Sequence, residues 1–273
     1  MSRGLLSEAS VVTRVEPQTC PSRGVPVVDD TQVRVPTRAA VAWQTLLTAI
    51  AAQPGPHDRP LDILDLGGGT GGLAVPLAQA GHAVTVVDPS PDALAALEHR
   101  AAGSGSVRAV QGDAADLPRV VPSGGFDVVV CHGVLEHVDD VASALVAIAG
   151  ALRPGGLLSV VTANRHAAVL SRALAGHFAD AHRALDDPDG RWGPSDPLPR
   201  RFDVAGLTAL LGAAGLSVTT VRAARVLADL VPGSLVDPEP AAARALQALE
   251  AQLCAHPAFL ATAAALHVLA TRG

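Results

Sequence analysis

The chain has 273 residues, of which 49% are hydrophobic, and a formal net charge of −6 at pH 7. This length and composition suit one α/β domain with appendages, and the negative charge argues against broad, non-specific nucleic-acid binding, although a local basic patch is compatible with it. Its three cysteines lack the spacing of metal ligands, and no signal peptide or membrane-spanning stretch is recognisable, so we expect a cytoplasmic protein without a metal or a membrane partner.

In chain order, the first expected feature is a tail. Residues 1–35 are rich in Pro, Ser, Thr, Val and Arg without helical or strand periodicity, so we expect a largely disordered segment before a domain at 36–273. A helix is predicted from Pro36, with an apolar face that ends before Pro54-Gly55-Pro56. That face consists of Trp43, Leu46, Leu47 and Ile50.

Residues 61–72 read LDILDLGGGTGG, a short apolar strand that opens into five glycines in six positions. Glycine is used in this way where backbone must turn sharply and lie against a ligand. Leu73 and Leu77 then start the apolar face of a helix whose N-terminus points at the bound group. Gly67, Gly69 and Gly72 also satisfy the dinucleotide fingerprint G-x-G-x-x-G, which is weak in isolation.

Carboxylates at the ends of the predicted strands distinguish the possible nucleotides. Asp88 closes the strand Ala83 to Val87, where an acid can accept hydrogen bonds from both ribose hydroxyls of either NAD or an adenosyl ligand. Asp65 could pair with a ligand ammonium, and Asp113, after the strand Val107 to Gln111, could accept from an adenine amino group. Ammonium, ribose and adenine together describe S-adenosylmethionine. The alternative is that Asp88 and Asp113 only cap the turns that follow them.

The remaining elements alternate between helix and strand. Ser90-Pro91 begins a helix through Arg100, and Asp139 and Asp140 cap a helix whose apolar stripe includes Leu152. The later expected elements are a strand from Gly155-Gly156 through Val161, a helix from Asp203 to Gly215, strands 216–222 and 265–270, and a helix between them with Leu246, Leu249 and Leu253. This alternation predicts a doubly wound, mostly parallel sheet with helices on both faces, and residues 65–71, 88, 113 and 131–137 fall at its ligand-binding edge.

The motifs GDAADLP at 112–118, FDVVVCHGVLEH at 126–137 and LRPGG at 152–156 add to the glycine loop. With them the chain resembles the class I S-adenosylmethionine-dependent methyltransferases from about Pro36 to its end. Within that family it is most similar to the bacterial tRNA carboxymethoxyuridine methyltransferases, which methylate a wobble-uridine carboxylate. Arg38 followed by Trp43, HGVLE at 132–136, and the segments 164–178 and 249–272 carry this similarity.

The resemblance implies a seven-stranded Rossmann-like sheet whose last strand inserts antiparallel, and it implies roles for particular residues. The residues implied to bind S-adenosylmethionine are Arg38, Asp65, Gly67, Gly68, Gly69, Asp88, Pro89, Asp113, Ala114 and His132. His132, His137 and Arg165 are the candidate catalytic residues. A hydroxyl or amine acceptor often needs a general base, which either histidine could supply, whereas an ionised carboxylate does not, and Arg165 could bind such a carboxylate or an adjacent phosphate. His132 could instead be a core histidine, His137 a solvated residue at a helix start, and Arg38 a surface helix arginine.

The segment 164–202 is expected to be a substrate lid whose helical period breaks after about Phe178, with Arg200 and Arg201 as candidate substrate-binding residues. Its DDPDGR at 186–191 replaces the basic run of the tRNA family, and four Phe, two Trp and no Tyr leave few platforms for an unstacked base. The acceptor is therefore either tRNA or a small metabolite methylated on oxygen or nitrogen. An NAD-dependent oxidoreductase and a non-catalytic cofactor-binding module are the alternatives, and the oligomeric state is left open.

Overall fold

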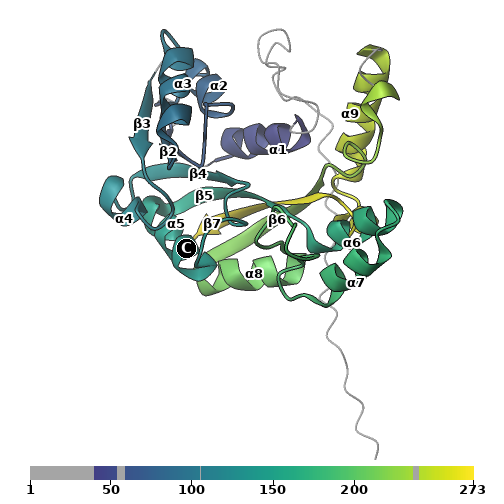
Figure 1. The fold of residues 1–273 in the computed structure, drawn as a ribbon. Coiled ribbons are helices and arrows are strands. Elements are labelled where there is room, and N and C mark those ends of the chain that lie inside the picture. The colour runs from purple at the N-terminus through teal and green to yellow at the C-terminus, as the bar shows by residue number, and fades with distance from the viewer. Residues whose placement is uncertain (1–39, 54–58, 105, 236–239) are drawn as a thin grey trace, which may run out of the picture.

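The computed structural model describes residues 40–53, 59–104, 106–235 and 240–273 (Figure 1). The predicted tail at 1–35 and the predicted cofactor residue Arg38 lie outside these ranges. None of the helices within the described ranges has the length and apolar character needed to cross a membrane.

A single seven-stranded sheet in the order β3-β2-β1-β4-β5-β7-β6 forms the centre of the described chain. Its strands are β1 (Asp62–Leu66), β2 (Ala83–Asp88), β3 (Val107–Gln111), β4 (Phe126–His132), β5 (Leu152–Ala163), β6 (Leu216–Ala224) and β7 (Ala265–Arg272). Strands β1 to β5 pair in parallel, whereas β7 runs antiparallel to both β5 and β6. The doubly wound, mostly parallel sheet and its antiparallel last strand are therefore confirmed.

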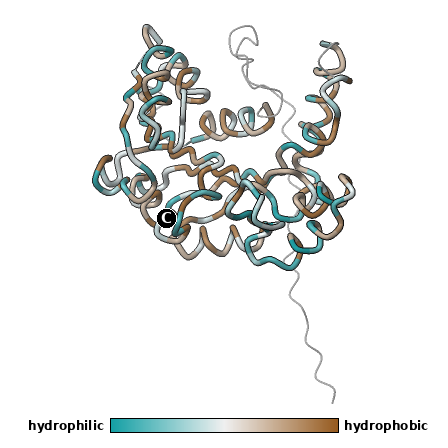
Figure 2. Tube along the Cα trace, viewed as in Figure 1, coloured by the Kyte–Doolittle hydropathy of each residue, from teal (hydrophilic) through white to brown (hydrophobic). Residues whose placement is uncertain are grey.

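Helices cover both faces of this sheet (Figure 1). On one face, α1 (Ala40–Ala51), α2 (Ala74–Gln79) and α3 (Pro91–Ala101) pack their apolar residues against β1, β2 and β4. On the other face lie α4 (Leu117–Val120), α5 (Val141–Ala151) and α8 (Val204–Ala213). Figure 2 shows the hydrophobic residues concentrated along the central strands between the two helical layers.

Local capping chemistry sets several helix starts as the sequence predicts. The Ser90 hydroxyl accepts from the Ala93 N–H at 3.2 Å and so caps α3. Asp140, not Asp139, caps α5 by accepting from the Ser143 N–H at 3.1 Å. Asp203 caps α8 in the same way. Each cap satisfies backbone donors that the helix itself cannot pair.

Two sequence predictions need correction. Leu152 is the first residue of β5 rather than part of the α5 stripe, because it pairs with Phe126 at the start of β4, across a register irregularity. The helical pattern of the predicted lid also continues beyond Phe178, as α7 (Phe178–Asp186) packs against α6 (Arg165–Leu174). Ala181 and Ala184 are the buried residues of α7, so its inner face is made of small side chains that a search for large apolar residues overlooks.

The remaining helices lie near the C-terminal strands. They are η1 (Gly233–Leu235), α9 (Pro240–Leu253) and α10 (Pro257–Leu260). The buried Glu250 of α9 accepts hydrogen bonds from the backbone N–H groups of Val226, Leu227 and Ala228, at 2.6–2.9 Å. This carboxylate ties α9 to the loop that follows β6, on the same edge of the sheet as the ends of β1, β4 and β5.

Candidate functional site

Four neighbouring strands bring predicted site residues to one edge of the sheet. Asp65 is the penultimate residue of β1, and Asp88 and His132 end β2 and β4. Asp113 follows β3. Because β3, β2, β1 and β4 are adjacent and parallel, their carboxyl ends share this edge, where open α/β sheets bind ligands.

The glycine loop lies tightly against this edge. The Gly67 N–H donates to the Val87 carbonyl at 2.7 Å, and Gly67 has φ +70°, a left-handed conformation that favours glycine. A Cβ on Gly67 would overlap Val134, and a Cβ on Gly68 would lie 2.5 Å from Asp65 Oδ2. By contrast, a Cβ on Gly72 would meet nothing within 4 Å. The close helix packing that the third glycine of a dinucleotide fingerprint serves is therefore not required here.

Asp65 is a buried carboxylate without a full set of partners. Its residue is 2% exposed, and its Oδ2 has no hydrogen-bond partner. Burial, with a further contribution from the charge of Asp88, raises the pKa of Asp65 to about 7. A cation placed beside Oδ2 would satisfy it and restore the charged form, so this carboxylate fits a ligand ammonium.

Asp88 and Asp113 both bind backbone donors of the loops around them. Asp88 Oδ2 accepts from the Gly69 N–H and Oδ1 from the Ser90 N–H, each at 2.9 Å. Asp113 is exposed, and its Oδ1 accepts from the Ala115 N–H at 2.8 Å and the Asp116 N–H at 3.2 Å. The turn-capping interpretation thus applies to both acids, and their ribose and adenine contacts stay predictions.

The other predicted cofactor residues lie beside these two acids. Pro89 is exposed directly after Asp88, and its carbonyl accepts from Gln111 Nε2 at 3.3 Å. Ala114 is 3% exposed and packs in the core beneath Asp113. Their contacts with a cofactor also stay predictions.

The loop after β4 carries two histidines with different surroundings. His132 is partly buried and its Nε2 lies 2.9 Å from Ser159 Oγ. Burial, helped by His267, holds the pKa of His132 well below its usual value. His137 is exposed at the surface. A neutral His132 with so low a pKa is a weak general base, and His137 fits the solvated interpretation better than a pocket wall.

Glu136, the last residue of the HGVLE motif, is a further buried acid at this edge and was not among the predicted site residues. It is 4% exposed; Oε1 accepts from the Ala163 N–H at 2.6 Å, and Oε2 has no hydrogen-bond partner. Burial raises its pKa. An acid directly after the apolar pair Val134-Leu135, in the segment between a core strand and the next helix, was the signal that could have marked it.

The predicted arginines hold the predicted lid segment together. Arg201 is 7% exposed and forms a bidentate pair with Asp196, at 2.7 and 2.9 Å, while its guanidinium lies 4.2 Å from the ring centroid of Trp192. Arg165 donates to the Asp187 carbonyl at 2.8 Å, and Arg200 donates to the Val138 carbonyl. These contacts give each arginine a structural role, and its binding of substrate stays a prediction.

Two depressions lie around these arginines. One of about 490 Å³ brings Arg165, Arg200 and Arg201 together with Asp139, Asp140, Asp189 and Asp203. A smaller one of about 210 Å³ lies at the ends of β5 and β6 and is lined by Ala163, Trp192, Arg201 and Arg225 among others. The predicted substrate-binding residues therefore share one surface, although acids are interleaved with them.

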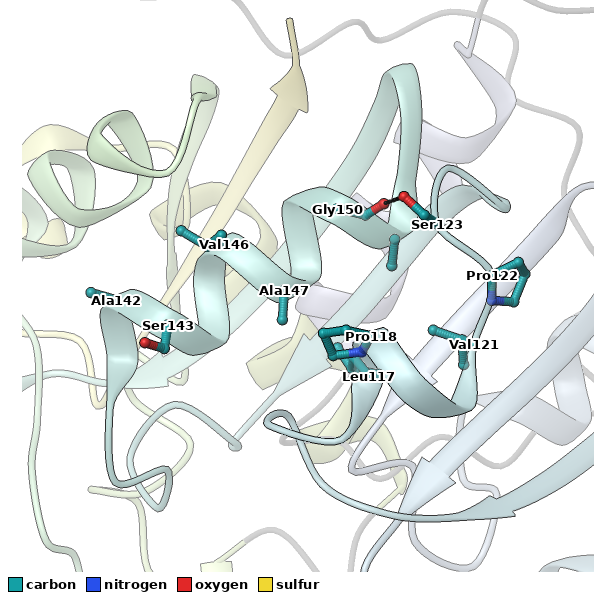
Figure 3. A pocket seen from close by; sticks show the side chains of 11 residues that line it. Leu117, Pro118, Val121, Pro122, Ser123, Ala142, Ser143, Val146, Ala147 and Gly150 are labelled. Atoms are coloured by element: carbon teal, nitrogen blue, oxygen red, sulfur yellow. Dashed lines mark hydrogen bonds between the residues drawn. The ribbon is translucent and has the colours of Figure 1, made fainter.

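A third depression, of about 450 Å³, lies between α4 and α5 (Figure 3). It is lined by apolar and small residues such as Leu117, Val121, Val146 and Ala147, together with two serines. None of the lining residues is an acid, a base or a cysteine. This groove offers no group suited to acid–base or cation-binding chemistry, so we place the candidate site at the strand ends instead.

Comparisons with known proteins agree with this geometry. A methyltransferase domain profile matches residues 64–160. The chain is 33% identical over 144 residues to the tRNA 5-carboxymethoxyuridine methyltransferase of Escherichia coli strain K12, covering 52% of this chain and 54% of that protein. It is 34% identical over 156 residues to the ubiquinone biosynthesis O-methyltransferase of Methylocella silvestris, covering 52% and 57%. The chain thus spans about half the length of the curated relatives it matches.

Among solved structures, the fold is similar to that of the magnesium protoporphyrin IX methyltransferase of Synechocystis PCC 6803, whose structure contains bound SAH. The TM-score is 0.55 at 16% identity, covering 87% of this chain and 86% of that one. At this identity the likeness shows the fold alone. Residues 64–160 thus match a methyltransferase domain, and the sheet that contains them has the fold of a solved methyltransferase.

Proposed function

We propose that this protein transfers a methyl group from S-adenosylmethionine to a carboxylate, with the carboxymethoxy group of a modified tRNA wobble uridine as the first candidate acceptor. The observation that carries the cofactor half of this proposal is the buried Asp65, whose unpartnered Oδ2 lies directly beneath Gly68. Asp65 would hold the cofactor's ammonium, Asp88 its ribose, and Asp113 with Ala114 its adenine.

The bound cofactor supplies an electrophilic methyl group on a positively charged sulfur. What the chain contributes is alignment, because holding the reacting groups in position can account for about 7–11 kcal/mol of barrier lowering. Gly67 and Gly68 let the loop pack against Val134 and Asp65, where a Cβ would clash, and the Asp88 contacts with the Gly69 and Ser90 N–H groups keep that loop in place.

The electrostatics of His132 favour an acceptor that is already ionised. A phenol or amine acceptor often needs a general base near neutral pH, whereas the partly buried His132 has a pKa well below its usual value and His137 is exposed. A carboxylate carries its nucleophilic charge at pH 7 and needs no such base. The similarity to the E. coli tRNA enzyme supports the same acceptor class.

A small acidic metabolite is the second candidate acceptor. It is favoured by the acids that line the arginine-containing depression where a tRNA phosphate would have to bind, which are Asp139, Asp140, Asp189 and Asp203. Phosphate contacts supply most nucleic-acid affinity, so acids in that position oppose RNA more than they oppose a compact ligand. The similarity to an enzyme named for ubiquinone biosynthesis is compatible with a small molecule.

Calorimetric titration with three ligands tests the cofactor. We expect the full chain to bind S-adenosylmethionine and S-adenosylhomocysteine but not NAD. Gly68→Ala should weaken both adenosyl ligands because its Cβ would lie 2.5 Å from Asp65 Oδ2, whereas Gly72→Ala, in the same loop, should bind them as the native protein does. Tight NAD binding, or equal effects of the two glycine substitutions, would contradict the proposal.

Transfer of a labelled methyl group tests the acceptor. We expect label to enter tRNA that carries the carboxymethoxy base and not tRNA that lacks it. Arg200→Ala should lower this transfer about tenfold or more if Arg200 binds the acceptor's carboxylate or an adjacent phosphate, because a charge-assisted hydrogen bond contributes about 1.5–3 kcal/mol. Arg200→Lys, which keeps the charge, is the matched control. Transfer to a small acid with none to tRNA would establish the second candidate instead.

A further inference from the structure

Three adjacent strands carry a chain of buried polar side chains that links His132 to the interior of the sheet. Ser159 of β5 is fully buried, and its Oγ lies 2.9 Å from Nε2 of His132 on β4 and 2.8 Å from Nε2 of His267 on β7. The two imidazole rings are 5.5 Å apart and edge to face. Apolar residues dominate these strands, so a serine held between two histidines needs a specific explanation.

The strand register explains how these three residues meet. His132 pairs with Val161, which in turn pairs with His267, so both histidines lie at the same level across β4, β5 and β7. Ser159 precedes Val161 by two residues and therefore projects from the same face of the sheet. The hydroxyl group is thus bracketed by rings from both neighbouring strands.

Proton counting restricts the hydrogen bonds to two arrangements. A serine hydroxyl has one proton and can donate it to only one of the two Nε2 atoms. The other ring must then carry a proton on its own Nε2 and donate it to Ser159 Oγ. Both rings are neutral near pH 7, because burial lowers their pKa values, to about 4 for His267, where the nearby Arg222 cation contributes.

The surroundings of His267 select between these arrangements. His267 is 1% exposed, and its Nδ1 is buried without a hydrogen-bond partner. If His267 accepted at Nε2, its proton would sit on Nδ1 as an N–H without an acceptor, and orphaned buried N–H groups are rare because they cost a full desolvation penalty. His267 therefore donates from Nε2 to Ser159, and Ser159 donates to Nε2 of His132.

We propose that Ser159 and His267 are positioning residues that hold His132 in the tautomer with its proton on Nδ1. The ring then presents an N–H donor at the end of β4. This donor suits a carboxylate oxygen of the bound cofactor, and it does not suit an ammonium or another hydrogen-bond donor. The tautomer follows from the hydrogen bonds within the sheet. Its role toward a ligand carboxylate rests on the proposed function.

Nitrogen-15 NMR of histidine-labelled full-length protein at pH 7.5 tests the tautomer without reference to activity. Protonated and unprotonated nitrogens of a neutral ring give separate resonances, which His132→Gln and His267→Gln variants assign. We expect His132 protonated on Nδ1 and His267 on Nε2. The opposite pattern in the native protein overturns the proposal, and through-bond correlation of each ring to its own backbone resonances replaces a variant that does not fold.

Substitutions at Ser159 test the positioning role. Ser159→Ala should release His132 into a mixture of tautomers and weaken S-adenosylhomocysteine about fivefold to tenfold in calorimetry, and Ser159→Thr, which restores a hydroxyl, should recover both. Thr162→Val is the matched control, because Thr162 is also buried on β5 but its Oγ1 has no hydrogen-bond partner. A native His132 tautomer in Ser159→Ala would contradict the positioning role. If the native protein shows the expected tautomers but binds no cofactor, that result would instead count against the proposed function.

Discussion

Asp65→Asn is expected to stabilise the ligand-free protein at pH 8 by about 2–4 kcal/mol while weakening S-adenosylmethionine binding by about tenfold to a hundredfold. The stability gain arises because the native side chain is a buried carboxylate whose Oδ2 has no partner, and ionising it in the folded state is costly. An amide carries no charge and avoids that cost. The loss of affinity arises because the same amide cannot attract the cofactor's ammonium.

The stability gain has a defined pH window. Burial raises the pKa of Asp65 from 3.8 to about 7 in the folded state. Between those values the folded protein binds more protons than the unfolded chain, so this group makes the native protein less stable as pH rises. The advantage of Asp65→Asn should therefore be smaller at pH 5 than at pH 8, and should level off above about pH 7.

Urea unfolding at pH 5 and pH 8, with calorimetric titration of the cofactor at the same values, measures both effects. Titration of the ligand's own groups is common to the native and variant proteins and cancels in the comparison. Asp62→Asn is the control, because Asp62 lies at the opposite end of β1, is 41% exposed and pairs with Arg153. A destabilised Asp65→Asn protein with native cofactor affinity would show that Asp65 is only a structural residue.

Arg201→Ala is expected to lower the free energy of unfolding by about 3–5 kcal/mol, because it would leave a buried carboxylate without its cation. The Asp196 side chain is fully buried and that of Arg201 is 5% exposed. Although burial alone would raise the pKa of Asp196, Arg201 and the backbone donors around it hold that pKa below its usual value. The substitution also removes the guanidinium that stacks on Trp192.

Chemical denaturation of Arg201→Ala beside Arg119→Ala provides the measurement and its control. Arg119 also pairs with an aspartate, Asp116, but its side chain is 76% exposed, so solvent screening makes that pair contribute little. Loss of methyl transfer in Arg201→Ala at unchanged stability would assign Arg201 to substrate binding. A large loss of stability would mean that the substrate-binding test must rest on Arg200.

The positions of the strands along the chain and several helix starts could be read from the sequence because their causes are local. An apolar run such as 83–87 followed by an acid, or a Ser90-Pro91 cap, acts within a few residues of itself. The start of β5 at Leu152 could not be read in this way. An apolar residue such as Leu152 fits the buried stripe of a helix as well as a buried strand. Its pairing with Phe126, which lies far away in the sequence, makes it a strand residue.

In the candidate site, too, some features followed from local sequence and others only from the tertiary structure. By itself, the sequence determined that the glycines at 67–69 and the acids Asp65 and Asp88 lie together, because strand ends of a parallel sheet necessarily share an edge. Only the tertiary structure decided which of these acids lacks a partner, since Asp88 meets the Gly69 and Ser90 N–H groups whereas Asp65 Oδ2 meets none.

Long-range packing likewise decided the role of Arg201 and the hydrogen bonds that join His132, Ser159 and His267. A basic residue in a lid predicts an anion site, but the guanidinium of Arg201 is held by Asp196 and Trp192 once α6 and α7 pack together. Ser159 and His267 are 108 residues apart, and nothing local in either strand names the other as its partner. Burial and hydrogen-bond partners depend on which distant surfaces meet, so the sequence could indicate the chemistry available here while only the folded chain assigned it.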